Sequence, residues 1–181
     1  MEVMTGPKGI GETKQAELLS STTRHDEESR LIPASAKQVF DYLDDHSRLS
    51  SHMSQSSWMM GGGRMHIQVD AGRGQFVGSH IRLSGKVLGI NLFLDEVVTQ
   101  HEPPYRKAWQ TVGALRLLVI GHYRMGLEVK PQNGGSNLRA FIDYELPTTL
   151  STRWLGYLFG GIYARWCIRQ MIQGAREHFS P

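Results

Sequence analysis

The feature that constrains the fold of this chain most strongly is a long run of alternating apolar and polar residues. Within 64–70 the odd positions are apolar and the even positions are polar or charged. Successive side chains of a strand point to opposite faces, so this pattern predicts strands with one apolar face. Similar segments predict strands over 78–89, 92–102, 106–112, 117–130 and 138–146.

Short turns separate these segments, and the clearest is Asn133-Gly134-Gly135. An Asn-Gly pair between two alternating runs is typical of a tight β-hairpin. Because the connections are too short for crossovers, the strands should form one antiparallel sheet in which chain neighbours pair.

The segment before this region predicts one more strand and two short helices. Residues 24–32 form a charged strand that Pro33 ends, because proline cannot donate to a ladder. Ser35 and Gln38 have the spacing of a capping box, so a helix should begin here. A second short helix is predicted over 47–53. The apolar residues of the first helix fall on one face: Val39, Phe40 and Leu43.

The C-terminal segment predicts one long helix, from about Leu150 to Phe179. Pro147 ends the last strand, and Thr149 or Ser151 can cap the helix. This is the segment long and apolar enough to cover the apolar face of the sheet. The fold class is therefore α+β: a curved antiparallel sheet of about seven strands around a long C-terminal helix, with two short helices after the first strand.

Small residues recur every four positions in that helix, at Gly156, Gly160 and Ala164. Glycine inside a helix costs about 1 kcal/mol relative to alanine, so the two glycines need a reason. Two interpretations are open: close packing of the helix on the sheet, or space for a ligand.

Composition limits the class of protein. With 181 residues, 40% of them hydrophobic and 20% charged, the chain suits one globular domain, which we assign to 23–181 after a flexible arm at 1–22. A net charge of +3 without a dense basic stripe does not indicate nucleic-acid binding. No segment has the unbroken apolar length of a membrane span, and the N-terminus lacks the apolar core of a signal peptide. These features predict a cytoplasmic protein.

The motif search predicts no metal site, no cofactor and no covalent nucleophile. The single cysteine, Cys167, lies in an apolar helical pattern and is expected to be a small buried hydrophobe. His66, His80 and His122 lie on the charged faces of their strands, which indicates solvated histidines. Asp41, Asp44, Asp45 and His46 form an acidic cluster at the end of the first helix. A solvated helix end is favoured for this cluster over metal binding.

Several motifs resemble the SRPBCC helix-grip superfamily, which includes birch-pollen-allergen-like proteins, START domains and polyketide cyclase/dehydrase-like proteins. They are Ile32-Pro33-Ala34-Ser35 leading into 39–43, Val97-Val98 ahead of Glu102-Pro103-Pro104, and Tyr144-Glu145-Leu146-Pro147. The resemblance implies a helix-grip fold with an internal pocket for apolar or aromatic molecules. It implies no catalytic residue, because the superfamily has no universal catalytic motif.

Strand alternation places one set of side chains toward such a pocket. Tyr123 and Tyr144 add a hydroxyl to an apolar ring, which suits a ligand with one polar end. The alternative is that they pack in the core and bond to the backbone. Glu96 shares the parity of its apolar neighbours and is a weak candidate for a catalytic acid or base. The predicted ligand-binding residues are Met65, Ile67, Leu83, Val87, Tyr123, Met125, Ile142, Tyr144, Phe159, Ile162 and Tyr163.

Three functions follow as hypotheses. The first is binding or transport of a hydrophobic small molecule such as a lipid, polyketide or aromatic compound. The second is a non-metal cyclase or dehydratase that uses the same pocket. The third is docking to a membrane or partner through Trp154, Tyr157, Phe159 and Trp166. A homodimer is compatible with all three.

Overall fold

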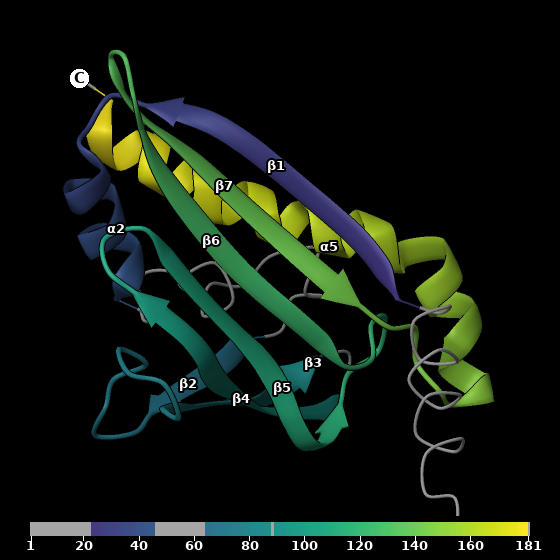
Figure 1. Cartoon of the computed structure of the whole chain (residues 1–181). Helices are drawn as coiled ribbons and strands as arrows, with labels where there is room; N and C mark the ends of the chain where they lie inside the picture. The colour runs from purple at the N-terminus through teal and green to yellow at the C-terminus, as the bar shows by residue number, and fades with distance from the viewer. Residues whose placement is uncertain (1–22, 46–63, 88, 181) are drawn as a thin grey trace, which may run out of the picture.

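The computed structural model describes residues 23–45, 64–87 and 89–180. The predicted arm at 1–22 and the second short helix at 47–53 lie outside the described residues. One long helix crosses a curved sheet, as Figure 1 shows. The described residues form β1 (Arg24–Ile32), α2 (Ala36–Asp44), β2 (Arg64–Val69), β3 (His80–Val87), β4 (Ile90–Glu102), β5 (Arg106–Arg116), β6 (Tyr123–Gln132), β7 (Gly135–Tyr144) and α5 (Leu150–Phe179).

The seven strands form one antiparallel sheet in the order β1-β7-β6-β5-β4-β3-β2. From β2 to β7 each strand pairs with the next, so the predicted meander is confirmed. The hairpin between β6 and β7 closes through Asn133 and Gly134, where Gly134 adopts a φ of 83°. That left-handed conformation explains the Asn-Gly sequence, since few other residues adopt it without strain.

The capping box also forms as predicted. The Ser35 hydroxyl accepts the backbone N–H of Gln38, and the Gln38 side chain accepts the backbone N–H of Ser35. α2 therefore begins directly after Pro33 ends β1. Its apolar face packs into the core, and Tyr42 stacks on His178 with ring centroids 4.3 Å apart. α2 thus lies at the C-terminal end of α5 (Figure 1).

One strand prediction is wrong. Residues 117–122 do not continue into β6 but form an irregular connection, while β5 extends past Val112 to Arg116. The pairing of β4 and β5 is irregular near this end, where Phe93 pairs with Arg116 but Asp95 pairs with Val112. The extra residues begin at Gly113, whose φ of 64° bends the strand.

The connection at 117–122 packs on the glycines of α5. A Cβ atom added to Gly160 would lie 3.0 Å from the carbonyl oxygen of Val119, and one added to Gly156 would lie 3.1 Å from the same atom. The Gly156 position would also be 2.5 Å from Cδ of Pro147. Of the two interpretations of these glycines, close packing is the one that the structure supports.

The core lies between the sheet and α5. It joins the inward face of the strands, α2 and the buried side of α5 in a single apolar cluster, in which Cys167 is buried as predicted. At the edge of the sheet, two side chains of β1 that point toward α5 are acidic rather than apolar. Asp26 pairs with Arg165 at 3.6 Å and Glu28 with Arg169 at 3.3 Å. Among the described residues, no helix is long and apolar enough to cross a membrane.

Candidate ligand-binding site

The structure brings most of the predicted ligand-binding residues together on the concave side of the sheet. Seven of them are buried in the core cluster, and Ile67 and Tyr163 are partly buried and pack against it. Phe159 and Ile162 lie apart from this set, because 47% and 49% of their surface is exposed on the outer side of α5. The seven buried residues are Met65, Leu83, Val87, Tyr123, Met125, Ile142 and Tyr144.

A buried acid lies within this apolar set. Glu96 is only 3% exposed, and in β4 it pairs with Ile81 of β3 and Thr111 of β5. Its inward direction follows from alternation with Leu94 and Val98, which are also buried. Such a carboxyl group needs hydrogen bonds, because an unpaired buried polar group is costly.

The Tyr123 hydroxyl supplies one of these bonds by donating to Glu96. Burial raises the pKa of Tyr123 well above its usual value, and the nearby charge of Glu96 raises it further. The phenol therefore keeps its proton and remains a hydrogen-bond donor. An acid on β4 and a hydroxyl on β6 thus form a polar pair surrounded by apolar side chains.

Two side chains of α5 approach this pair from the helix. Tyr163 and Cys167 are one helical turn apart and so share a face. Burial is the main cause of the raised pKa of each, and it brings the pKa of Cys167 to about 12. The charge of Glu96 raises the pKa of both groups further. A thiol with such a pKa stays protonated and is a poor nucleophile.

A second buried polar cluster lies at the end of α2. The Lys107 side chain is fully buried, and its Nζ donates to the Asp44 backbone carbonyl and carboxylate, both at 2.8 Å. His101 Nε2 contacts the same carboxylate at 3.0 Å. Burial lowers the pKa of Lys107, and Asp44 opposes that shift. The interpretation of Asp44 as a solvated helix end is therefore wrong, because two side chains from the sheet cover it.

The direction of His101 depends on a β-bulge. Val98 pairs with Trp109, but Gln100 pairs with Ala108, so Thr99 is an extra residue in β4. One extra residue reverses the alternation, which turns His101 to the same face as its partner Lys107. The sequence did indicate that Lys107 points inward, because it lies two positions before the buried Trp109 in the same strand. No local pattern indicated that Asp44 would be its ion-pair partner.

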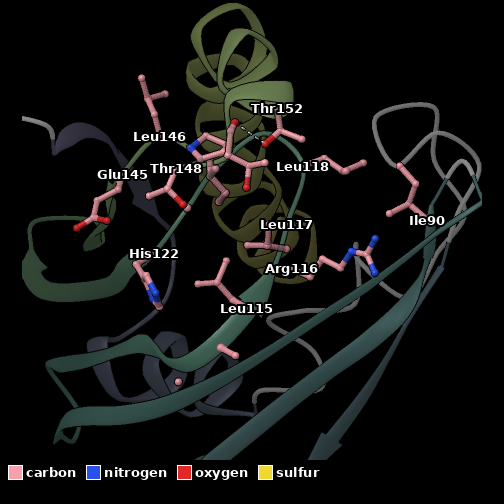
Figure 2. Close-up of a pocket in the computed structure, with 16 residues that line it drawn as sticks. Ile90, Leu115, Arg116, Leu117, Leu118, His122, Glu145, Leu146, Thr148 and Thr152 are labelled. Carbon is pink, nitrogen blue, oxygen red and sulfur yellow. Dashed lines mark hydrogen bonds between the residues drawn. The ribbon is translucent and has the colours of Figure 1, made fainter.

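A pocket of about 450 Å³ opens at the other end of the sheet, between the end of β5, the connection 117–122 and the start of α5 (Figure 2). Leu115, Leu117 and Leu118 form its apolar wall and also pack against the core cluster. The pocket is lined by Ile90, Gly113, Ala114, Leu115, Arg116, Leu117, Leu118, Ile120, Gly121, His122, Glu145, Leu146, Pro147, Thr148, Thr149 and Thr152.

His122 connects this pocket to the polar pair. Its Nδ1 lies 3.1 Å from the Thr111 hydroxyl, and Thr111 accepts the backbone N–H of Tyr123 at 3.1 Å. Thr111 in turn is the β5 partner of Glu96. His122 itself is exposed, as is His66, which agrees with the sequence interpretation. His80 lies on the convex face with its ring 2.9 Å from Asp95.

The described residues contain no group of three or more His, Cys, Asp or Glu side chains that could hold a metal ion. What the geometry offers instead is an apolar interior with a carboxylate and a phenol at its centre. This arrangement suits a molecule that is mostly apolar and carries a hydrogen-bonding group.

Comparison with known proteins identifies a family for this chain. The model of the family described as polyketide cyclase/dehydrase and lipid transport matches residues 24–178. The chain belongs to this family. The match covers every strand and nearly all of α5, so the resemblance expected from the motifs is confirmed. A search of curated proteins gives no significant match.

Solved structures of the family's fold are similar in shape and distant in sequence. Ara h 8.0201 is 10% identical with a TM-score of 0.57, over 84% of this chain and 97% of its own. Norcoclaurine synthase from Thalictrum flavum, in complex with dopamine and hydroxybenzaldehyde, is 15% identical with a TM-score of 0.59, over 98% and 95%. The di-domain ARO/CYC protein StfQ from the steffimycin pathway is 10% identical with a TM-score of 0.62, over 92% of this chain and 54% of its own.

Proposed function

We propose that this member of the family binds a hydrophobic small molecule, a lipid, polyketide or aromatic compound with one polar group, between the concave face of the sheet and α5. The observation that carries the proposal is the hydrogen-bonded pair of Glu96 and Tyr123 inside the apolar cluster. Burying a carboxyl group weakens a purely structural core, so its presence favours a functional role.

The pocket of Figure 2 is the entrance in this proposal. Its volume of about 450 Å³ lies in the range of small-molecule sites. Its leucines are continuous with the core cluster, and His122 is linked through Thr111 to the polar pair. A molecule that enters here would meet apolar walls first and hydrogen-bonding groups further in. The structural relatives support the same class of ligand, since one was solved with two aromatic compounds.

A titration with the apolar fluorescent probe N-phenyl-1-naphthylamine tests the proposal. Ala114 lines the pocket and is exposed, so Ala114→Trp should fill the entrance and weaken probe binding at an unchanged melting temperature. Ala71→Trp is the matched control, because Ala71 is exposed in a turn outside that pocket. Equal probe binding by both variants and by the original protein would contradict the proposal. Native mass spectrometry of the purified protein would show any ligand that co-purifies.

The same polar pair supports a second candidate function, a cyclase or dehydratase. A carboxylate and a phenol in hydrogen-bond contact can accept one proton and stabilise charge on an oxygen, which are the two tasks of such a reaction. Glu96→Gln separates the two functions. An enzyme would lose turnover of an aromatic or polyketide substrate and keep binding, whereas a carrier would show no turnover before or after the change.

A further inference from the structure

The first half of α5 exposes an unusual number of large apolar side chains. Of the eleven exposed large hydrophobic residues in the described parts of the chain, five lie within the nine positions 154–162. Their exposed fractions run from 47% to 61%. Scattered single exposures are normal in proteins, but a contiguous group marks an interaction surface. The five residues, here called the apolar patch, are Trp154, Tyr157, Leu158, Phe159 and Ile162.

The apolar patch continues along the helix as a row of arginines. Trp154, Leu158 and Ile162 recur every four residues, and Arg165 and Arg169 follow at spacings of three and four on the same face. Trp166 does not belong to this surface, contrary to the sequence hypothesis, because it is partly buried and its ring lies 5.8 Å from that of Tyr163. The outer face of α5 is therefore apolar in its first half and basic in its second.

The charged side chains of α5 are mostly basic. α5 contains four arginines, and its one acid is Glu177, in the last turn. Arg165 and Arg169 pair with β1, but Arg153 and Arg176 have no acidic partner among the described residues. Arg153 instead lies 5.9 Å from the ring centre of Tyr157, so a cation without an acidic partner in the described parts of the chain borders the apolar patch.

We infer that this face of α5 docks on the surface of an anionic lipid bilayer. Trp and Tyr favour the boundary between acyl chains and headgroups, and arginine beside them can bind lipid phosphates. A second copy of the chain fits the face less well. A symmetric contact would cover Arg153 without offering an acid from the same face, because the helix has none before Glu177.

The apolar patch on α5 lies next to the pocket. Thr149 and Thr152 line the pocket, and the apolar patch begins two residues later at Trp154. In Figure 1 the first turns of α5 lie beyond the end of β7, so the patch and the pocket occupy the same end of the molecule. A docked protein would therefore hold its pocket close to the lipid. The inference does not depend on the proposed ligand binding, which can be measured without lipid.

Flotation with lipid vesicles tests the inference. The protein should float with vesicles of equal parts phosphatidylcholine and phosphatidylglycerol, and much less with phosphatidylcholine alone. Leu158→Asn should weaken binding on the order of tenfold and keep the melting temperature, because Leu158 is exposed. Val77→Asn makes the same kind of change at a 64% exposed valine between β2 and β3, and it should bind as the original protein does.

Three results would overturn the inference. They are no flotation of the original protein, equal flotation of the Leu158 variant, and a dimer in solution that Leu158→Asn dissociates while vesicle binding is absent. The last would assign the face to a second copy. If the original protein bound the fluorescent probe but did not float with vesicles, the docking inference would fail while the proposed ligand binding would stand.

Discussion

Two glycine-to-alanine substitutions in α5 should have opposite effects on stability. Alanine is favoured over glycine inside a helix by about 1 kcal/mol, so each change brings the same local gain. At Gly174 an added Cβ would meet one atom within 4 Å, the Tyr42 hydroxyl at 3.7 Å, which is ordinary contact. Gly174→Ala should therefore stabilise the protein by about 1 kcal/mol.

At Gly156 the same methyl group has no room. The new Cβ would be 2.5 Å from Cδ of Pro147 and 3.1 Å from the Val119 carbonyl oxygen, and a proline ring and a backbone atom yield little. Overpacking costs about 1–3 kcal/mol, so after the local gain Gly156→Ala should lose about 1 kcal/mol. For a chain of this size the two variants should melt about 4–8 °C apart.

Thermal melts followed by far-UV circular dichroism would measure this difference, with urea melts as a check on the free energy of unfolding. The comparison is internally controlled, because both variants carry the same substitution in the same helix. If Gly156→Ala were as stable as Gly174→Ala, α5 would not be packed against Pro147 and the connection 117–122 as described.

Three further predictions concern titratable groups. Lys107→Met leaves the buried Asp44 carboxylate without its lysine, so the free energy of unfolding in urea should fall by about 3–5 kcal/mol, and a fall below 1 kcal/mol would contradict a buried pair. The pKa of Cys167 is about 12, so a disulfide reagent at neutral pH should modify this thiol in the unfolded protein and leave it intact in the folded one. The hydrogen bond from His25 to Asp143 raises the His25 pKa above 6.5. The stabilisation from protonated His25 is fully present below pH 6.5 and is lost as the pH rises through the pKa of His25 in the folded protein. His25→Gln should therefore reduce the fall in melting temperature that the original protein shows above that pKa. An unchanged dependence of melting temperature on pH would refute this.

Much of the fold could be predicted because its signals are local. Alternation over a few residues specified the strands, and Ser35 and Gln38 specified the start of α2 within a single turn. The bounds of the long helix, Leu150 and Phe179, could be predicted because Pro147 and the length of the apolar pattern fix them. These signals need no knowledge of distant parts of the chain.

The errors arose where a distant contact decides the structure. The connection 117–122 alternates like a strand, yet β5 ends at Arg116 and Val119 of the connection packs on the glycines of α5. Lys107 meets Asp44 across a separation of 63 positions. α5 is apolar on its outer face as well as its inner face, so periodicity could not show that Phe159 and Ile162 point outward.

The composition of β1 affects how the protein behaves when many copies are crowded together. β1 is an outer strand of the sheet, and six of its nine residues are ionisable. An outer strand offers unpaired backbone groups that invite another chain to extend the sheet. Any such addition would bring a foreign strand against charges on both faces, including Asp26, Glu27 and Glu28. The β1 edge of a protein that exposes an apolar patch on α5 is thus a poor template for fibrils.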